Sequence, residues 1–160
     1  MGGKMMKIKE GTTIVAPTEE RIKKLEAYSK INYPDSFIRF LNEYNGGIPI
    51  TNSFIVNNHE YVIERFLCIS DNPKVSKLGD YDISIVLSQI DERLTANPEL
   101  IGDELIPIAA LLAGDFVCLD FRDKKIPTIS IWLHEESDAF APITENIANS
   151  FEKFISMLTE

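Results

Sequence analysis

Acidic side chains are the residues of this chain that are best able to do chemistry. Asp115, Asp120 and Asp123 fall on and beside one predicted strand. Paired carboxylates in such positions can act in acid–base catalysis or hold magnesium. Aspartates in turns more commonly accept hydrogen bonds from their own backbone. We therefore expect turn-forming roles for Asp115 and Asp123, and keep a small enzyme that uses Asp115, Asp120 and His134 as a minor alternative.

Two further acidic groups lie elsewhere in the sequence. Glu135 and Glu136 follow another predicted strand, and Asp80 and Asp82 precede a predicted helix. Each group alone is typical of a solvated face. Together the three groups indicate an electronegative surface suited to a basic partner. The partner-binding residues that we expect on this surface are Asp80, Asp82, Asp115, Asp123, Glu135 and Glu136.

The histidines and cysteines give weaker indications of chemistry than the acidic residues do. His59 lies in a polar turn, and His134 begins a His-Glu-Glu sequence without the second histidine of a zinc-protease motif. Cys68 and Cys118 lie far apart within apolar segments and lack the paired spacing of a zinc site, so we expect two buried, reduced thiols. The glycine patterns that bind nucleotide phosphates do not occur. We expect no catalytic residue, no metal and no cofactor.

Composition narrows the choice of partner. The 160 residues carry 16 Lys and Arg against 25 Asp and Glu, a formal net charge of −9. A surface of that sign repels phosphate backbones, so we expect no binding to nucleic acid. The length predicts one domain with its own core. We find no signal sequence and no apolar segment long enough to span a membrane, and we expect a cytoplasmic location.

Helices are predicted at the start of the domain. Residues 1–16 form an N-terminal extension that we expect to be partly frayed. Thr18 is a typical N-cap for a helix that ends near residue 30. Pro34 suits the first position of a second helix, which the Asn-Gly-Gly sequence at residues 45–47 terminates.

Strands dominate the rest of the chain. β-branched and aromatic residues indicate one or two strands between residues 54 and 69, and helical spacing returns from residue 83 to about residue 97. Three short strands are predicted in the second half, over residues 105–109, 116–121 and 129–133. We expect Thr144 to cap a last helix, with Ile147 and Phe151 on its buried side.

This order of elements favours an α+β fold over alternating βαβ units. Short connections between the predicted strands allow an antiparallel meander. No repeat and no linker rich in glycine or serine divides the chain, so we expect residues 17–160 to form a single domain.

Five segments occur in an order that resembles a known family. Residues 33–49 carry proline, phenylalanine-leucine and Asn-Gly-Gly-x-Pro, with Tyr33 where leucine is common, and residues 64–66 resemble the next strand. Residues 105–120 carry Ile-Pro-Ile-Ala, Gly-Asp and Leu-Asp. Residues 127–135 contain a strand that ends in tryptophan and a polar pair, and residues 149–155 carry Ser-Phe-x-x-Phe. Together they resemble the SUKH superfamily, which includes yeast cell-wall regulators of the Smi/Knr type and many bacterial immunity proteins.

The resemblance implies an α+β fold with a central, mostly antiparallel sheet flanked by helices. It also implies a binding role, because bacterial members are similar to antitoxins that neutralise a secreted polymorphic toxin, often a nuclease. We therefore expect a non-enzymatic immunity protein that binds a basic, cognate toxin. The alternative is a regulatory interaction module without a toxin partner, like the eukaryotic relatives.

Overall fold

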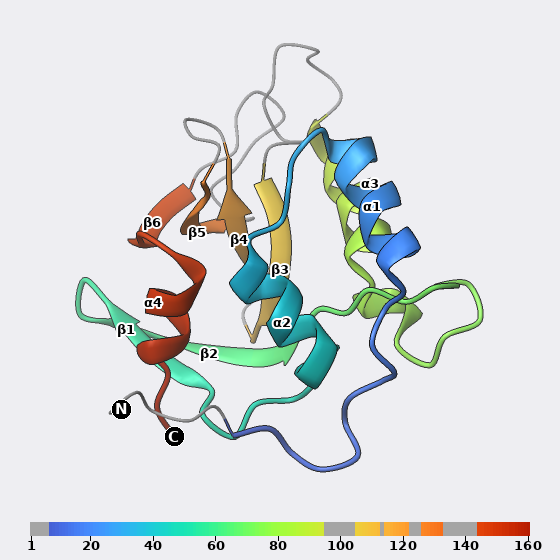
Figure 1. Ribbon diagram of the computed structural model, residues 1–160. Helices are drawn as coiled ribbons and strands as arrows, with labels where there is room; N and C mark the ends of the chain where they lie inside the picture. The colour runs from blue at the N-terminus through green and yellow to red at the C-terminus, as the bar shows by residue number, and fades with distance from the viewer. Residues whose placement is uncertain (1–6, 95–104, 113, 122–125, 133–143) are drawn as a thin grey trace.

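The computed structural model describes residues 7–94, 105–112, 114–121, 126–132 and 144–160. Within them, six strands form one antiparallel sheet in the order β1-β2-β3-β4-β5-β6, so each strand pairs with its neighbours in sequence. Four α-helices and one short 3-10 helix accompany this sheet (Figure 1). The arrangement confirms the predicted α+β class with an antiparallel sheet.

The bounds of the elements are as follows. The strands are β1 (Ser53–Val56), β2 (His59–Phe66), β3 (Leu105–Leu111), β4 (Phe116–Asp120), β5 (Thr128–Trp132) and β6 (Thr144–Ala148). The helices are α1 (Glu19–Ser29), α2 (Asp35–Tyr44), the 3-10 helix η1 (Gly79–Tyr81), α3 (Ile83–Leu94) and α4 (Phe151–Ser156).

Helix α1 begins and ends at its predicted signals. The Thr18 hydroxyl accepts a hydrogen bond from the backbone N–H of Arg21 at 3.2 Å, which confirms the predicted N-cap. The helix ends at Lys30, whose φ of 58° is left-handed. Ile22 and Leu25 are the buried residues of α1, so one side of the helix faces the core as its spacing predicted.

Helix α2 lies one residue later than predicted, with Pro34 as N-cap and Asp35 as its first residue. The Asn-Gly-Gly sequence ends it for reasons of packing as well as backbone freedom. Gly46 has a φ of +74°, and a Cβ on it would lie 2.9 Å from the Cβ of Cys68. The buried Asn45 amide donates hydrogen bonds to the carbonyls of Val15 and Ile69, each at 2.8 Å.

The apolar segment after α2 forms two strands joined by a tight turn. Asn57 and Asn58 have φ angles of 52° and 65°, and two consecutive positive φ values are what a type I′ hairpin requires. Of the one or two strands predicted here, the structure therefore contains two. His59, expected in a polar turn, is the exposed first residue of β2, with its ring 4.4 Å from that of Tyr61.

The last helix is shorter than predicted, and the prediction of Thr144 as its cap is wrong. Residues Thr144–Ala148 form β6, which pairs antiparallel with β5. The helix begins only at Phe151, and the Ser150 hydroxyl caps it by accepting a hydrogen bond from the N–H of Lys153 at 3.1 Å. Pairing with β5 supplies partners for the backbone of β6, and this outweighs the helical spacing of Ile147.

Aromatic side chains hold the helices against the sheet. Helices α2 and α4 lie together in front of the sheet in Figure 1. The Phe40 ring on α2 lies 4.7 Å from that of Phe66 on β2 and 5.3 Å from that of Phe151 on α4. Phe37 also contacts Phe151, at 5.3 Å. Edge-to-face pairs of this kind stabilise a core beyond the area that they bury.

Candidate partner-binding surface

Two of the six predicted surface acids are at least partly exposed in the structure, and they lie in different parts of the fold. Asp80 is exposed on η1. Asp115 is half-buried in the turn between β3 and β4, where its carbonyl accepts a hydrogen bond from the N–H of Leu111 at 2.9 Å. Asp115 thus lies between two strands where the sequence indicated a turn, and the turn-forming role of its side chain stays a prediction. Asp123, Glu135 and Glu136 lie outside the described residues.

The prediction that Asp82 belongs to the partner-binding surface is wrong, because its side chain is fully buried and cannot contribute to an exposed face. One carboxylate oxygen accepts a hydrogen bond from the N–H of Ser70 at 2.7 Å. The other accepts from the N–H of Ser84 at 2.8 Å and from the Ser84 hydroxyl, which places Asp82 at the start of α3. Arg21 on α1 donates to the Ser70 carbonyl and to the Ser84 hydroxyl, at 3.0 and 3.2 Å.

The residues of the enzymatic alternative are only partly described. Asp120 accepts a hydrogen bond from the Ser130 hydroxyl on the neighbouring strand β5 at 3.0 Å. This contact ties β4 to β5. Asp115 lies at the opposite end of β4, and His134 is outside the described residues. Where the structure describes the chain, no group of three or more potential His, Cys, Asp or Glu ligands gathers.

Both cysteines are buried thiols, as predicted. Cys68 follows β2, and its Sγ donates a hydrogen bond to the Leu78 carbonyl at 3.5 Å. Burial raises the pKa of Cys68 to about 12, with a further rise from the charge of Asp82. A thiol with such a pKa stays protonated near neutral pH and is a poor nucleophile.

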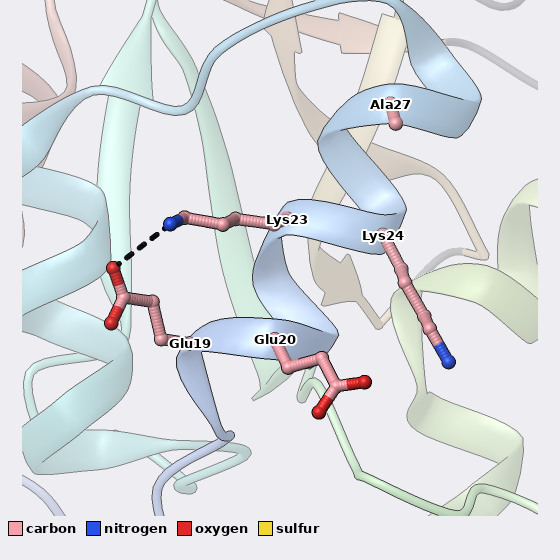
Figure 2. A pocket seen from close by; sticks show the side chains of 5 residues that line it. All are labelled: Glu19, Glu20, Lys23, Lys24 and Ala27. Atoms are coloured by element: carbon pink, nitrogen blue, oxygen red, sulfur yellow. Dashed lines mark ion pairs between the residues drawn. The ribbon is translucent and has the colours of Figure 1, made fainter.

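The outer side of α1 carries a broad, open hollow of about 490 Å³ (Figure 2). Two glutamates and two lysines line it, so its formal charge is zero. Figure 2 shows Glu19 and Lys23 turned toward each other, with a carboxylate–ammonium distance of 3.3 Å. Both side chains are largely exposed, and such pairs contribute little to stability or recognition. We find nothing in this hollow that selects a ligand.

A second hollow, of about 310 Å³, lies between α2 and α4, and we call it the α2–α4 groove. Phe40 and Phe151, which are buried and in edge-to-face contact, line it. Arg39, Glu43 and Glu152 also line it and are exposed. The groove therefore combines an aromatic base with a charged rim.

Tyr44 completes the aromatic side of the α2–α4 groove and is half-buried there. Burial raises the pKa of Tyr44, and the charge of the adjacent Glu43 raises it further. Tyr44 is therefore a neutral hydrogen-bond donor at physiological pH. None of the acids predicted from sequence belongs to this groove, because its formation depends on two helices that are far apart in the chain.

Among the helices of the described residues, none combines the length and the apolar character needed to cross a membrane. Comparison with known proteins gives two findings. The family model SUKH_6, described as SMI1-KNR4 cell-wall, matches residues 19–155. A Bacillus subtilis (strain 168) protein described as "SPbeta prophage-derived uncharacterized protein YokK" is 25% identical over 154 residues, which cover 89% of this chain and 75% of that protein.

Proposed function

This chain belongs to the SUKH (SMI1-KNR4) family, and we propose that it is an immunity protein that neutralises a cognate toxin by binding it. The observation that carries the proposal is the family match, which runs from the first residue of α1 into α4 and so includes the whole sheet. The proposed partner is a polymorphic toxin of nuclease type, and the proposed place of binding is the cytoplasm. The B. subtilis relative is described as uncharacterized, so it contributes no activity to the argument.

The charge of the chain supports a basic partner. A nuclease needs a positively charged groove for its nucleic acid. A protein with a net charge of −9 is attracted to such a groove over distances of about 10 Å at moderate salt, which speeds association. To inhibit in this way, the inhibitor needs only to occupy the nucleic-acid groove of the toxin, and it makes or breaks no bond itself.

The test is co-expression of the chain with the product of the neighbouring gene, followed by measurement of growth and by co-purification. We expect the chain to restore growth and to form a stoichiometric complex. Failure to bind and failure to restore growth would favour a regulatory interaction module without a toxin.

Charge reversal tests the acidic surface separately. We expect Asp80→Lys combined with Asp115→Lys to weaken toxin binding about tenfold at low salt, because two attractive charges become repulsive. Titration calorimetry at two salt concentrations measures the effect. The matched control is Glu19→Lys combined with Glu20→Lys, which makes the same change of charge on α1. Equal losses in both double variants would show that only the total charge matters.

A further inference from the structure

The aromatic base of the α2–α4 groove suits a cation. Phe40 and Phe151 expose only 8% and 4% of their surface and form the packed floor, so the half-buried ring of Tyr44 beside them is the one that a cation can reach. The faces of aromatic rings carry partial negative charge and attract guanidinium or ammonium groups. Contact between Phe37 and Phe151, at 5.3 Å, fixes the two helices relative to each other. A ligand would therefore find the groove already formed, which lowers the cost of binding.

The rim of the groove carries one net negative charge. Glu43 comes from α2 and Glu152 from α4, and both are exposed. Neither forms an ion pair in the part of the chain that the structure describes, and neither does Arg39, the cation on the same rim. Two carboxylates and one guanidinium give this rim a formal charge of −1, in contrast to the neutral hollow on α1.

Size limits what the groove can hold. Its volume of about 310 Å³ lies at the lower end of the roughly 300–1,000 Å³ typical of small-molecule sites. One side chain of a protein partner fits such a space better than a cofactor does. Among cationic side chains, arginine is more weakly hydrated than lysine, stacks on aromatic rings and can bond two carboxylates through its planar fork.

We propose that the α2–α4 groove receives an arginine side chain of the partner protein, between the Tyr44 ring and the carboxylates of Glu43 and Glu152. This inference rests on the proposed function for the identity of the partner, and on charge complementarity for the choice of side chain. An arginine that is anchored in a preformed pocket is typical of the few residues that dominate the affinity of an interface.

The first experiment uses the isolated protein and needs no toxin. The probe is N-acetyl-L-arginine amide, titrated into the ¹⁵N-labelled full chain and followed by NMR. We expect saturable shifts at the amides of Phe40, Tyr44 and Ile155, and about tenfold weaker binding to the Glu43→Gln/Glu152→Gln variant. N-acetyl-L-citrulline amide, which has nearly the same shape without the charge, should bind at least tenfold more weakly than the arginine probe.

Matched controls distinguish binding in the groove from attraction to the overall charge of the protein. Glu19→Gln/Glu20→Gln removes the same charge from α1 and should leave arginine-probe binding unchanged. Because all four glutamates are exposed, we expect native thermal unfolding profiles in both double variants. Absence of saturable shifts at the groove, equal binding of the citrulline probe, or equal losses in both variants would overturn the inference.

The second experiment distinguishes the inference from the function on which it rests. The growth assay with the neighbouring gene product is repeated with Glu43→Gln/Glu152→Gln. If the wild type restores growth and the variant binds the toxin with undiminished affinity, arginine binding in the groove is refuted and the immunity role stays intact. Groove-specific arginine binding without rescue by the wild type would refute the immunity role and leave the groove as a cation-binding site.

Discussion

Asp82 connects three parts of the chain through one buried carboxylate. It caps α3 through Ser84, accepts a hydrogen bond from Ser70 beyond β2, and shares both serines with Arg21 of α1. The residues around Asp82 alternate polar and apolar positions before a helical stripe, which is typical of a helix start. Sequence reasoning placed the carboxylate at the surface because burial depends on α1 and the segment after β2, which are distant in sequence. Conversely, Thr18 could be assigned correctly because its cap bond is local.

We predict that Asp82→Ala lowers the free energy of unfolding by about 3 kcal/mol, since two half-buried N–H groups lose their acceptor at about 1–3 kcal/mol each. Asp82→Asn keeps one oxygen acceptor and should cost about 1 kcal/mol. Urea denaturation measures both values. The control is Asp80→Ala, at an exposed site, where we expect a change within about 0.5 kcal/mol. Equal stability of the Asp82→Ala and Asp80→Ala variants would contradict the structural role given to Asp82.

At the scale of elements, periodicity predicted α1, α2 and α3. The starts of α1 and α2 could also be predicted from Thr18 and Pro34, whereas the Asp82 cap of α3 was missed. The assignment of Thr144 as a helix cap is wrong for a physical reason. A five-residue stretch such as β6 has too few positions to separate strand from helix by spacing, and its pairing with β5 is a long-range contact. The α2–α4 groove could not be predicted from the sequence. The apolar stripe of each helix indicates that one side is buried, but not which other helix packs beside it.

Ser150 is the point at which the chain changes from strand to helix. We predict that Ser150→Ala lowers the free energy of unfolding by about 1 kcal/mol, the usual cost of losing an N-cap, because the N–H of Lys153 loses its acceptor. Thermal or urea unfolding gives the value. Ser156→Ala, at an exposed serine near the other end of α4, is the matched control and should change stability by less than about 0.5 kcal/mol. A larger loss in Ser156→Ala than in Ser150→Ala would argue against the observed start of the helix.

The charge of the whole molecule has opposite effects on stability and on association. A net charge of −9 repels itself in the folded state, and the described residues offer only two ion pairs against it, Lys7–Glu160 and Lys23–Glu19. Both pairs are exposed, so they lose little when salt screens them. Screening should therefore stabilise the fold, whereas it weakens long-range attraction to a basic toxin.

We predict that the Tm rises by about 2–4 °C, equivalent to about 1 kcal/mol, when NaCl increases from about 10 mM to about 100 mM and the Debye length falls from about 30 to about 10 Å. Differential scanning calorimetry measures the shift. Glu60→Gln/Glu64→Gln removes two exposed charges of β2 that form no ion pair among the described residues. This variant should have a higher Tm at low salt and a smaller response to NaCl. A Tm that falls with salt would mean that attractive pairs within the fold outweigh the repulsion of its excess negative charge.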